Sequence, residues 1–130
     1  MNYMVVGIGG IAGSIMRYLI SLYTMALWAG GFPIGTFSAN MAGCFSLGYL
    51  TGLNEKTGFI SKKVMLGLGT GMIGSLTTFS TFSMETIQLY ESGSFLMAGA
   101  YILLSAGLGL LLAGFGYLSG RKYFSKRNVK

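Results

Sequence analysis

A long apolar segment near the middle of the chain is interrupted by three serines, three threonines and two glycines between Gly71 and Ser83. A helix that faces lipid gains nothing from hydroxyl groups. Polar groups in the hydrocarbon core are costly, and they usually face a helix bundle, a cavity or an ion pathway. The stretch therefore predicts a polar interior surface within a membrane protein.

Composition supports a membrane setting. The 130 residues are 52% hydrophobic and only 9% charged, whereas soluble domains average about 25% charged residues. The chain has no histidine and one cysteine, Cys44, which excludes histidine-based sites and an internal disulfide. No nucleophile–base pair, metal cluster or phosphate-binding loop is present. We therefore expect residues 1–130 to form a single transmembrane domain that is not an enzyme.

Four apolar segments are each long enough to cross about 30 Å of hydrocarbon, which takes roughly 20 helical residues. They cover residues 3–27, 34–53, 64–90 and 95–118. The connectors between them are too short for a second domain. The sequence therefore predicts an all-α membrane protein with four transmembrane helices per subunit.

The third segment is too long for a straight upright helix, because its length would reach roughly 40 Å at about 1.5 Å per residue. Tilt is one explanation. We favour a break between Gly74 and Ser80, because the hydroxyl cluster falls there. Gly74 permits unusual backbone angles, and the β-branched Thr77 and Thr78 have reduced helix propensity. Carbonyls at an unwound helix can coordinate a cation, often sodium.

Pairs of glycines four residues apart recur along the chain, which predicts closely packed helices or an intimate oligomer. The pairs are Gly9/Gly13, Gly48/Gly52, Gly67/Gly71 and Gly116/Gly120. Four helices do not easily enclose a pore, so at least a dimer is expected.

The net charge of +6 is distributed very unevenly. Of the nine Lys and Arg residues, all but Arg17 fall at one side of the predicted spans: Lys56, Lys62, Lys63, Arg121, Lys122, Lys126, Arg127 and Lys130. Positive charge accumulates on the cytoplasmic side of membrane proteins, so both termini are predicted to be cytoplasmic. Residues 119–130 then form a basic cytoplasmic tail that sets orientation, with lipid or nucleic-acid binding as the alternative.

Three polar residues inside the spans each allow two interpretations. Arg17 is either an anchor that extends to the interface or a cation that attracts anions or holds another helix. Glu85 either pairs with polar or basic groups or couples a proton. Asn40 either joins helices or lines a pore, because its amide both donates and accepts hydrogen bonds.

Phe79 and Phe82 share one face of a helix and are interleaved with hydroxyl residues. Packing is the default role of such a pair. The positive edge of an aromatic ring can also solvate an anion weakly, and hydroxyls beside it can donate hydrogen bonds. Weak solvation suits conduction, in which an ion must enter the site and also leave it.

At these residues the chain resembles the Fluc (CrcB) family of fluoride channels. The run from Gly74 to Ser83 followed by Glu85 is similar to the signature of that family, and the likeness extends in order along essentially the whole chain. The other matching residues are Gly10, Gly13 and Arg17 in the first span, Gly35–Phe37, Asn40 and Gly43 in the second, and Tyr101 and Ser105 in the fourth.

The resemblance implies a fluoride-selective channel that exports fluoride passively and lowers its toxicity. It implies an antiparallel dimer with two pores, in the plasma membrane of a prokaryote. Phe79 and Phe82 would contact fluoride through their ring edges. The remaining members of the pathway would be Asn40, Ser80, Thr81, Tyr101 and Ser105.

The resemblance also implies a structural sodium ion at the dimer interface, held by main-chain carbonyls of Gly74 and Thr77 from each subunit. Arg17 would lie near the pore vestibule and stabilise the fold, and the role of Glu85 stays open. The resemblance by itself does not choose between a homodimer and a pair with a homologue.

The charge bias is at odds with one part of this expectation. An antiparallel homodimer requires one chain to insert in both directions, which calls for balanced charge. Either the bias is overridden, or the chain has a fixed orientation and pairs with an oppositely oriented homologue. A proton-coupled transporter similar to the small multidrug exporters is the alternative function. It needs a deep acidic residue, and the first span contains Arg17 instead.

Overall fold

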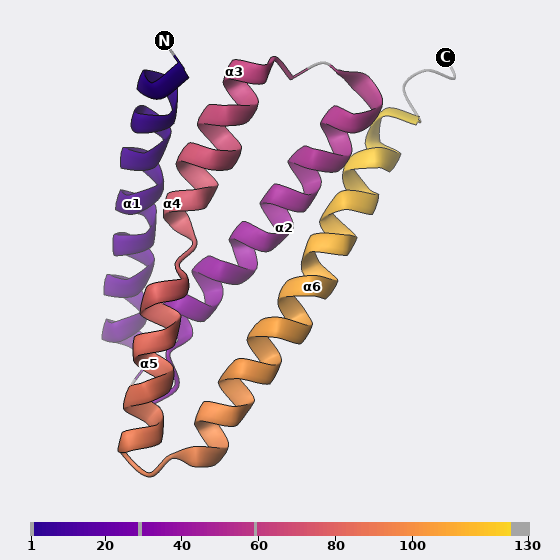
Figure 1. The fold of residues 1–130 in the computed structure, drawn as a ribbon. Coiled ribbons are helices and arrows are strands. Elements are labelled where there is room, and N and C mark those ends of the chain that lie inside the picture. Colours follow the sequence, from indigo (N-terminus) through magenta and orange to yellow (C-terminus); the bar gives the residue numbers. More distant parts are fainter. Residues whose placement is uncertain (1, 29, 59, 126–130) are drawn as a thin grey trace.

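The computed structural model describes residues 2–28, 30–58 and 60–125, and this part of the chain is entirely helical or connecting loop. Figure 1 shows the chain passing along the molecule four times. The elements are α1 (Asn2–Leu27), α2 (Ile34–Thr57), α3 (Lys62–Met65), the π-helix η1 (Leu66–Ile73), α4 (Gly74–Leu76), α5 (Phe79–Glu91) and α6 (Phe95–Ser125).

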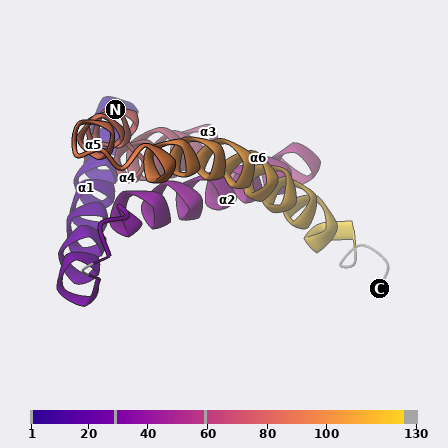
Figure 2. The same cartoon turned by 90° about the horizontal axis from the view of Figure 1, so that it is seen from below.

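Glycines bring α2 and α6 into backbone contact. A Cβ added at Gly48 would lie 2.2 Å from the carbonyl oxygen of Ala113, and one added at Gly116 would lie 2.3 Å from that of Phe45. A real Cβ does not fit at such distances, so only glycine allows this approach. Gly52 and Gly120 make the same kind of contact further along the two helices. Figure 2 shows α2 and α6 running together, away from α1.

The other two glycine pairs join α1 to η1. A Cβ at Gly13 would lie 2.0 Å from the carbonyl oxygen of Met72, and one at Gly9 would lie 2.1 Å from that of Gly67. Gly71 faces the Val6 carbonyl in return. The predicted role of the four glycine pairs in close helix packing is therefore confirmed for contacts within one chain.

The third pass is not a continuous α-helix. It begins with α3, the π-helix η1 and the short α4, and it continues as α5. Between α4 and α5 the helix is interrupted at Thr77 (φ −81°, ψ 150°) and Thr78 (φ −148°, ψ 125°), which are both extended. Gly74 has ordinary helical angles (φ −63°, ψ −31°). The expectation that Gly74 supplies unusual backbone angles is wrong, because the extended backbone falls on the two β-branched threonines instead.

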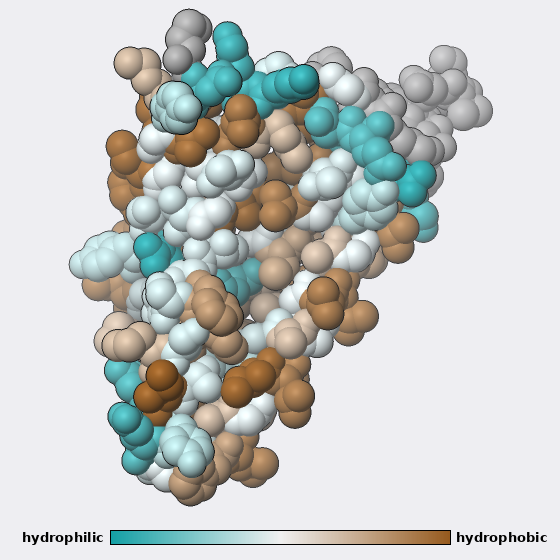
Figure 3. Space-filling model, in the orientation of Figure 1, coloured by the Kyte–Doolittle hydropathy of each residue, from teal (hydrophilic) through white to brown (hydrophobic). Residues whose placement is uncertain are grey.

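Apolar side chains cover much of the outer surface. Leu96, Leu103 and Leu110 on α6 are 89%, 75% and 76% exposed, and brown patches run along this helix in Figure 3. In the described chain, α1 and the stretch Phe95–Lys122 are long and apolar enough to cross a membrane. A soluble protein would bury such faces, so these surfaces are suited to lipid or to another subunit.

Hydrophilic side chains gather at the end of the molecule that holds both described chain ends (Figures 1 and 3). Lys62 and Lys63 open α3, and Arg121 and Lys122 lie in the last turns of α6. We call this the basic end. The predicted basic residues Lys126, Arg127 and Lys130 and the side chain of Lys56 lie outside the described residues.

Candidate functional site

The extended backbone at Thr78 is held by a side chain from another helix. Asn40 on α2 donates from Nδ2 to the Thr78 carbonyl at 3.1 Å, and the Thr78 N–H donates to Asn40 Oδ1 at 2.9 Å. Gly43 lies one turn further along α2, and the Thr77 side chain packs directly against it. A Cβ added at Gly43 would lie only 2.1 Å from Thr77 Cγ2, so a larger residue does not fit. α2 therefore meets the third pass at the interruption itself.

The side chain of Thr78 starts α5. Its Oγ1 accepts a hydrogen bond from the Thr81 N–H at 3.2 Å, which is a helix N-cap. The same oxygen lies 3.1 Å from the hydroxyl oxygens of both Ser80 and Thr81. The predicted pathway residues Ser80 and Thr81 thus belong to a cluster of hydroxyls at the N-terminus of α5.

These bonds leave two carbonyls without their helical donors. In a continuous α-helix the Thr78 N–H would bond to Gly74 and the Thr81 N–H would bond to Thr77. Asn40 and the Thr78 hydroxyl take those two N–H groups instead. Gly74 is exposed and Thr77 is half-buried, so both carbonyl oxygens remain accessible to a partner other than these two N–H groups.

A groove of about 520 Å³ runs beside the interruption. Its walls come from α2, from the third pass and from α6, and most of them are apolar. Six residues predicted from the sequence contribute to its lining: Asn40, Gly74, Thr77, Phe79, Phe82 and Ser105.

The groove also has lining residues that sequence reasoning missed, such as Met41 and Cys44 on α2 and Ile102 and Ala106 on α6. Their apolar character gave no signal for a site. Helical spacing would have placed Cys44 on the face of Asn40 and Ile102 on the face of Ser105, but it gives no such signal for Met41 and Ala106.

The two phenylalanines of the groove differ in their surroundings. Phe79 is 80% exposed, whereas Phe82 packs against Tyr101 with ring centroids 4.9 Å apart. The rings of Phe79 and Phe82 are 5.8 Å apart and inclined by 37°. The Phe82 ring is therefore held by the protein core, whereas the exposed Phe79 ring is available for contact with another subunit.

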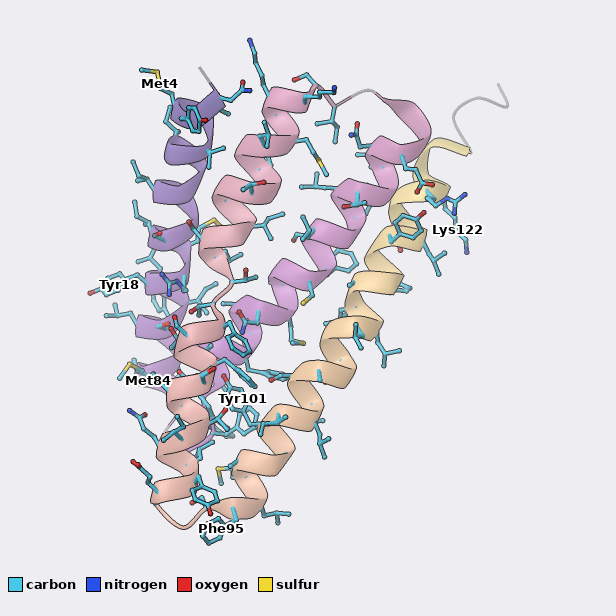
Figure 4. The ribbon with its side chains drawn as sticks, viewed as in Figure 1. Met4, Tyr18, Met84, Phe95, Tyr101 and Lys122 are labelled. Atoms are coloured by element: carbon cyan, nitrogen blue, oxygen red, sulfur yellow. The ribbon has the colours of Figure 1, made fainter. Side chains whose placement is uncertain are left out.

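Tyr101 and Glu85 form a partly buried polar contact beside the groove. Tyr101 is fully buried and donates from its hydroxyl to Glu85 Oε2 at 2.8 Å, and Thr36 donates to Oε1 at 2.7 Å. Figure 4 shows Tyr101 between α5 and α6. Both carboxylate oxygens are thus matched by hydroxyl donors, which favours the paired interpretation of Glu85.

The remaining sequence candidates do not line the 520 Å³ groove as the structure describes it. They are Arg17, Ser80, Thr81, Glu85 and Tyr101. Arg17 is half-buried on α1, and its Nε is buried without a hydrogen-bond partner in the described part of the chain.

The fold and the site define a small all-helical membrane protein with a polar helix interruption beside a groove. Residues 4–117 match the family model described as "CrcB-like protein, Camphor Resistance (CrcB)". The chain belongs to this family.

Curated relatives agree with the family match. A protein named Fluoride-specific ion channel FluC 1, from Bacillus thuringiensis subsp. konkukian, is 43% identical over 118 residues, which cover 91% of this chain and 86% of the relative. Fluoride-specific ion channel FluC from Oceanobacillus iheyensis is 45% identical over 115 residues, covering 88% of each chain. The protein of the same name from Desulfotalea psychrophila is 43% identical over 123 residues, covering 95% and 94%.

Proposed function

We propose that this chain is a subunit of a fluoride-selective ion channel, which passively exports fluoride from the cytoplasm and so lowers its toxicity. The observation that carries the proposal is the groove at the helix interruption, which brings Phe79, Phe82, Asn40 and Ser105 together from three parts of the chain. The names of the relatives support fluoride as the ion.

The groove's chemistry suits a small, strongly hydrated anion. Ring edges of Phe79 and Phe82 carry partial positive charge, and the hydroxyl of Ser105 can donate a hydrogen bond. The side-chain amide of Asn40 has two N–H groups. One of them donates to the Thr78 carbonyl, and the other can donate to an anion. These contacts replace water without a full positive charge that would trap the ion.

Passive export follows from the acid–base chemistry of fluoride. Hydrogen fluoride crosses membranes as a neutral molecule, dissociates inside the cell and leaves the anion behind. A channel lets that anion flow out down its electrochemical gradient. In this proposal Ser80 and Thr81 extend the polar pathway, and Tyr101 supports it by holding Phe82 and Glu85.

We further propose a structural sodium ion bound by the main-chain carbonyls of Gly74 and Thr77. The support is that the helical donors of both carbonyls are bonded elsewhere. Two oxygens are too few for a cation of this kind, which prefers several oxygen ligands. A second subunit would supply the rest, so the ion belongs at a dimer interface.

The assembly proposed is an antiparallel dimer in the plasma membrane of a prokaryote. The exposed Phe79 and the open groove support a second subunit. The charged end formed by Lys62, Lys63, Arg121 and Lys122 supports a cytoplasmic location for both termini. The second subunit is either a copy of this chain, if the bias is overridden, or an oppositely oriented homologue.

Purified protein in liposomes tests these proposals. The chain expressed alone is reconstituted, and an ion-selective electrode follows fluoride and chloride efflux. Fluoride efflux with negligible chloride efflux supports the channel. Full activity of the purified chain would show that no homologous partner is needed. Proton-dependent uptake of a lipophilic cation, with no fluoride efflux, would instead support the exporter-like alternative.

A further inference from the structure

A second groove, also of about 520 Å³, lies between α2 and the start of the third pass at the basic end. Leu47 and Gly69 belong to the lining of both grooves. The two hollows are therefore neighbours along α2 and η1. Together they extend from the phenylalanines to Lys62 at the basic end.

The polar groups of this second groove are hydrogen-bond donors. Lys62 brings an ammonium group, which only donates. Asn54 accepts a hydrogen bond from the Ile60 N–H on its Oδ1 at 3.2 Å, which leaves its NH₂ group as the available end. Thr70 makes no side-chain hydrogen bond in the described structure, unlike Thr51, which bonds back to the Leu47 carbonyl.

Acidic side chains are absent from the described lining of this groove. Glu55, the neighbour of Asn54, accepts a hydrogen bond from Tyr117 on α6, and the Arg121 guanidinium lies over the Tyr117 ring. The remaining walls include the apolar Leu47 and Leu66. Low-dielectric walls concentrate the field of a nearby charge, so the positive potential of Lys62 extends into the groove.

We propose that Lys62, Asn54 and Thr70 form an anion-collecting mouth, through which fluoride enters the groove of Phe79 and Phe82 from the basic end. This rests on the proposed channel function. The Lys62 charge raises the local concentration of fluoride, and the Asn54 amide and Thr70 hydroxyl replace part of its water. The mouth is built for a partly hydrated anion, since Lys62 is exposed to solvent.

The chain offers a matched control for the charge. Lys63 adjoins Lys62 at the same end and is also exposed, but it is not part of the groove lining. Fluoride current through planar bilayers is measured at low fluoride concentration for Lys62→Gln, Lys63→Gln and Lys62→Arg. We expect Lys62→Gln to lower the fluoride current by about two- to fivefold, because one positive charge attracts an anion through water by about 1 kcal/mol or less. The other two variants keep nearly the wild-type current.

Screening separates an electrostatic mouth from a structural effect. Adding a non-permeant salt shortens the Debye length from about 30 Å at 0.01 M to about 10 Å at 0.1 M. The deficit of Lys62→Gln is then expected to shrink. Thr70→Val, which preserves the shape of the side chain, is expected to lower the current about twofold at both ionic strengths, because a short hydrogen bond is little screened.

Equal losses in Lys62→Gln and Lys63→Gln would overturn the proposal, since the charge would then act only as general surface potential. Unchanged current in Lys62→Gln at low salt would overturn it too. Absence of fluoride current in the wild-type protein, both alone and reconstituted with an oppositely oriented homologue, would instead refute the channel function itself, so the two failures are distinguishable.

Discussion

The side-chain amide of Asn40 forms hydrogen bonds with both backbone polar groups of Thr78, although the two residues are 38 positions apart in the chain. This pair of bonds holds the third pass out of helical geometry at Thr77 and Thr78. It also withdraws the N–H that would otherwise bond to the Gly74 carbonyl. One side chain on α2 thus stabilises both the interruption and the oxygen proposed to bind sodium.

Replacing Asn40 by alanine is expected to destabilise the fold by about 1–3 kcal/mol, because the N–H and carbonyl of Thr78 lose their partners. Thermal unfolding in detergent measures this loss, and fluoride efflux should fall with it. Asn2→Ala, at the exposed start of α1, is the control and should unfold at the wild-type temperature. An unchanged unfolding temperature in Asn40→Ala would show that the bonds do not stabilise the interruption.

Substituting isoleucine for Phe79 or Phe82 is expected to lower fluoride efflux sharply, because an aliphatic side chain has no positive ring edge. Stability should distinguish the two variants. Phe79 is 80% exposed in one chain, whereas Phe82 packs on Tyr101, so only Phe82→Ile should also lower the unfolding temperature of the monomeric fold.

The control for the two phenylalanine variants is Phe95→Ile. Phe95 lies at the start of α6, is 60% exposed and does not line the groove. Efflux at the wild-type rate in both groove variants would exclude the ring-edge mechanism.

Removing the hydroxyl of Tyr101 is expected to cost about 1–3 kcal/mol of stability, because one oxygen of Glu85 then loses its donor inside the bundle. Tyr101→Phe is compared with Tyr90→Phe, in which the altered ring is 63% exposed. Combining Tyr101→Phe with Glu85→Gln should give a smaller loss than the two single losses added together, since the two residues share one interaction. Strict additivity in denaturant unfolding would show that the contact contributes nothing.

Adding one methyl group at Gly116 is expected to separate α2 from α6. A Cβ there would lie 2.3 Å from the Phe45 carbonyl oxygen, and overpacking of this kind typically costs about 1–3 kcal/mol. Gly114→Ala is the matched control two residues earlier, where a Cβ meets nothing within 4 Å. It should be neutral or slightly stabilising, because alanine favours helix. Equal unfolding temperatures in the two variants would contradict the packing argument.

Much of the helical architecture was predictable from sequence because its signals are local. Apolar length predicted the helices α1 and α6, and the glycine spacing predicted close helix packing. Which helices meet, α2 with α6 and α1 with η1, was not predicted. The π-helix η1 was not predicted, because no residue pattern distinguishes it from an α-helix. The extended angles at Thr77 and Thr78, with a helical Gly74, depend on Asn40 rather than on glycine freedom.

The candidate site was predicted in its residue types and was completed by the tertiary structure. The run from Phe79 to Ser83 indicates an ion pathway through its own alternation of rings and hydroxyls. The sequence did not separate Ser105, which lines the groove, from Tyr101, which lies beside it in contact with Glu85. The two polar residues are four positions apart and share one face of α6, so only tertiary packing determines where along that face the groove ends.

The sequence by itself thus determined a membrane-embedded helical chain, an interrupted third pass and the chemistry of its polar stretch, because these follow from composition and short spacing. The tertiary structure decided which carbonyls lose their partners, which polar residues face the groove, and that a second groove leads from it to Lys62. Those features depend on residues from α2, the third pass and α6 meeting in space. No local pattern in the chain encodes that meeting.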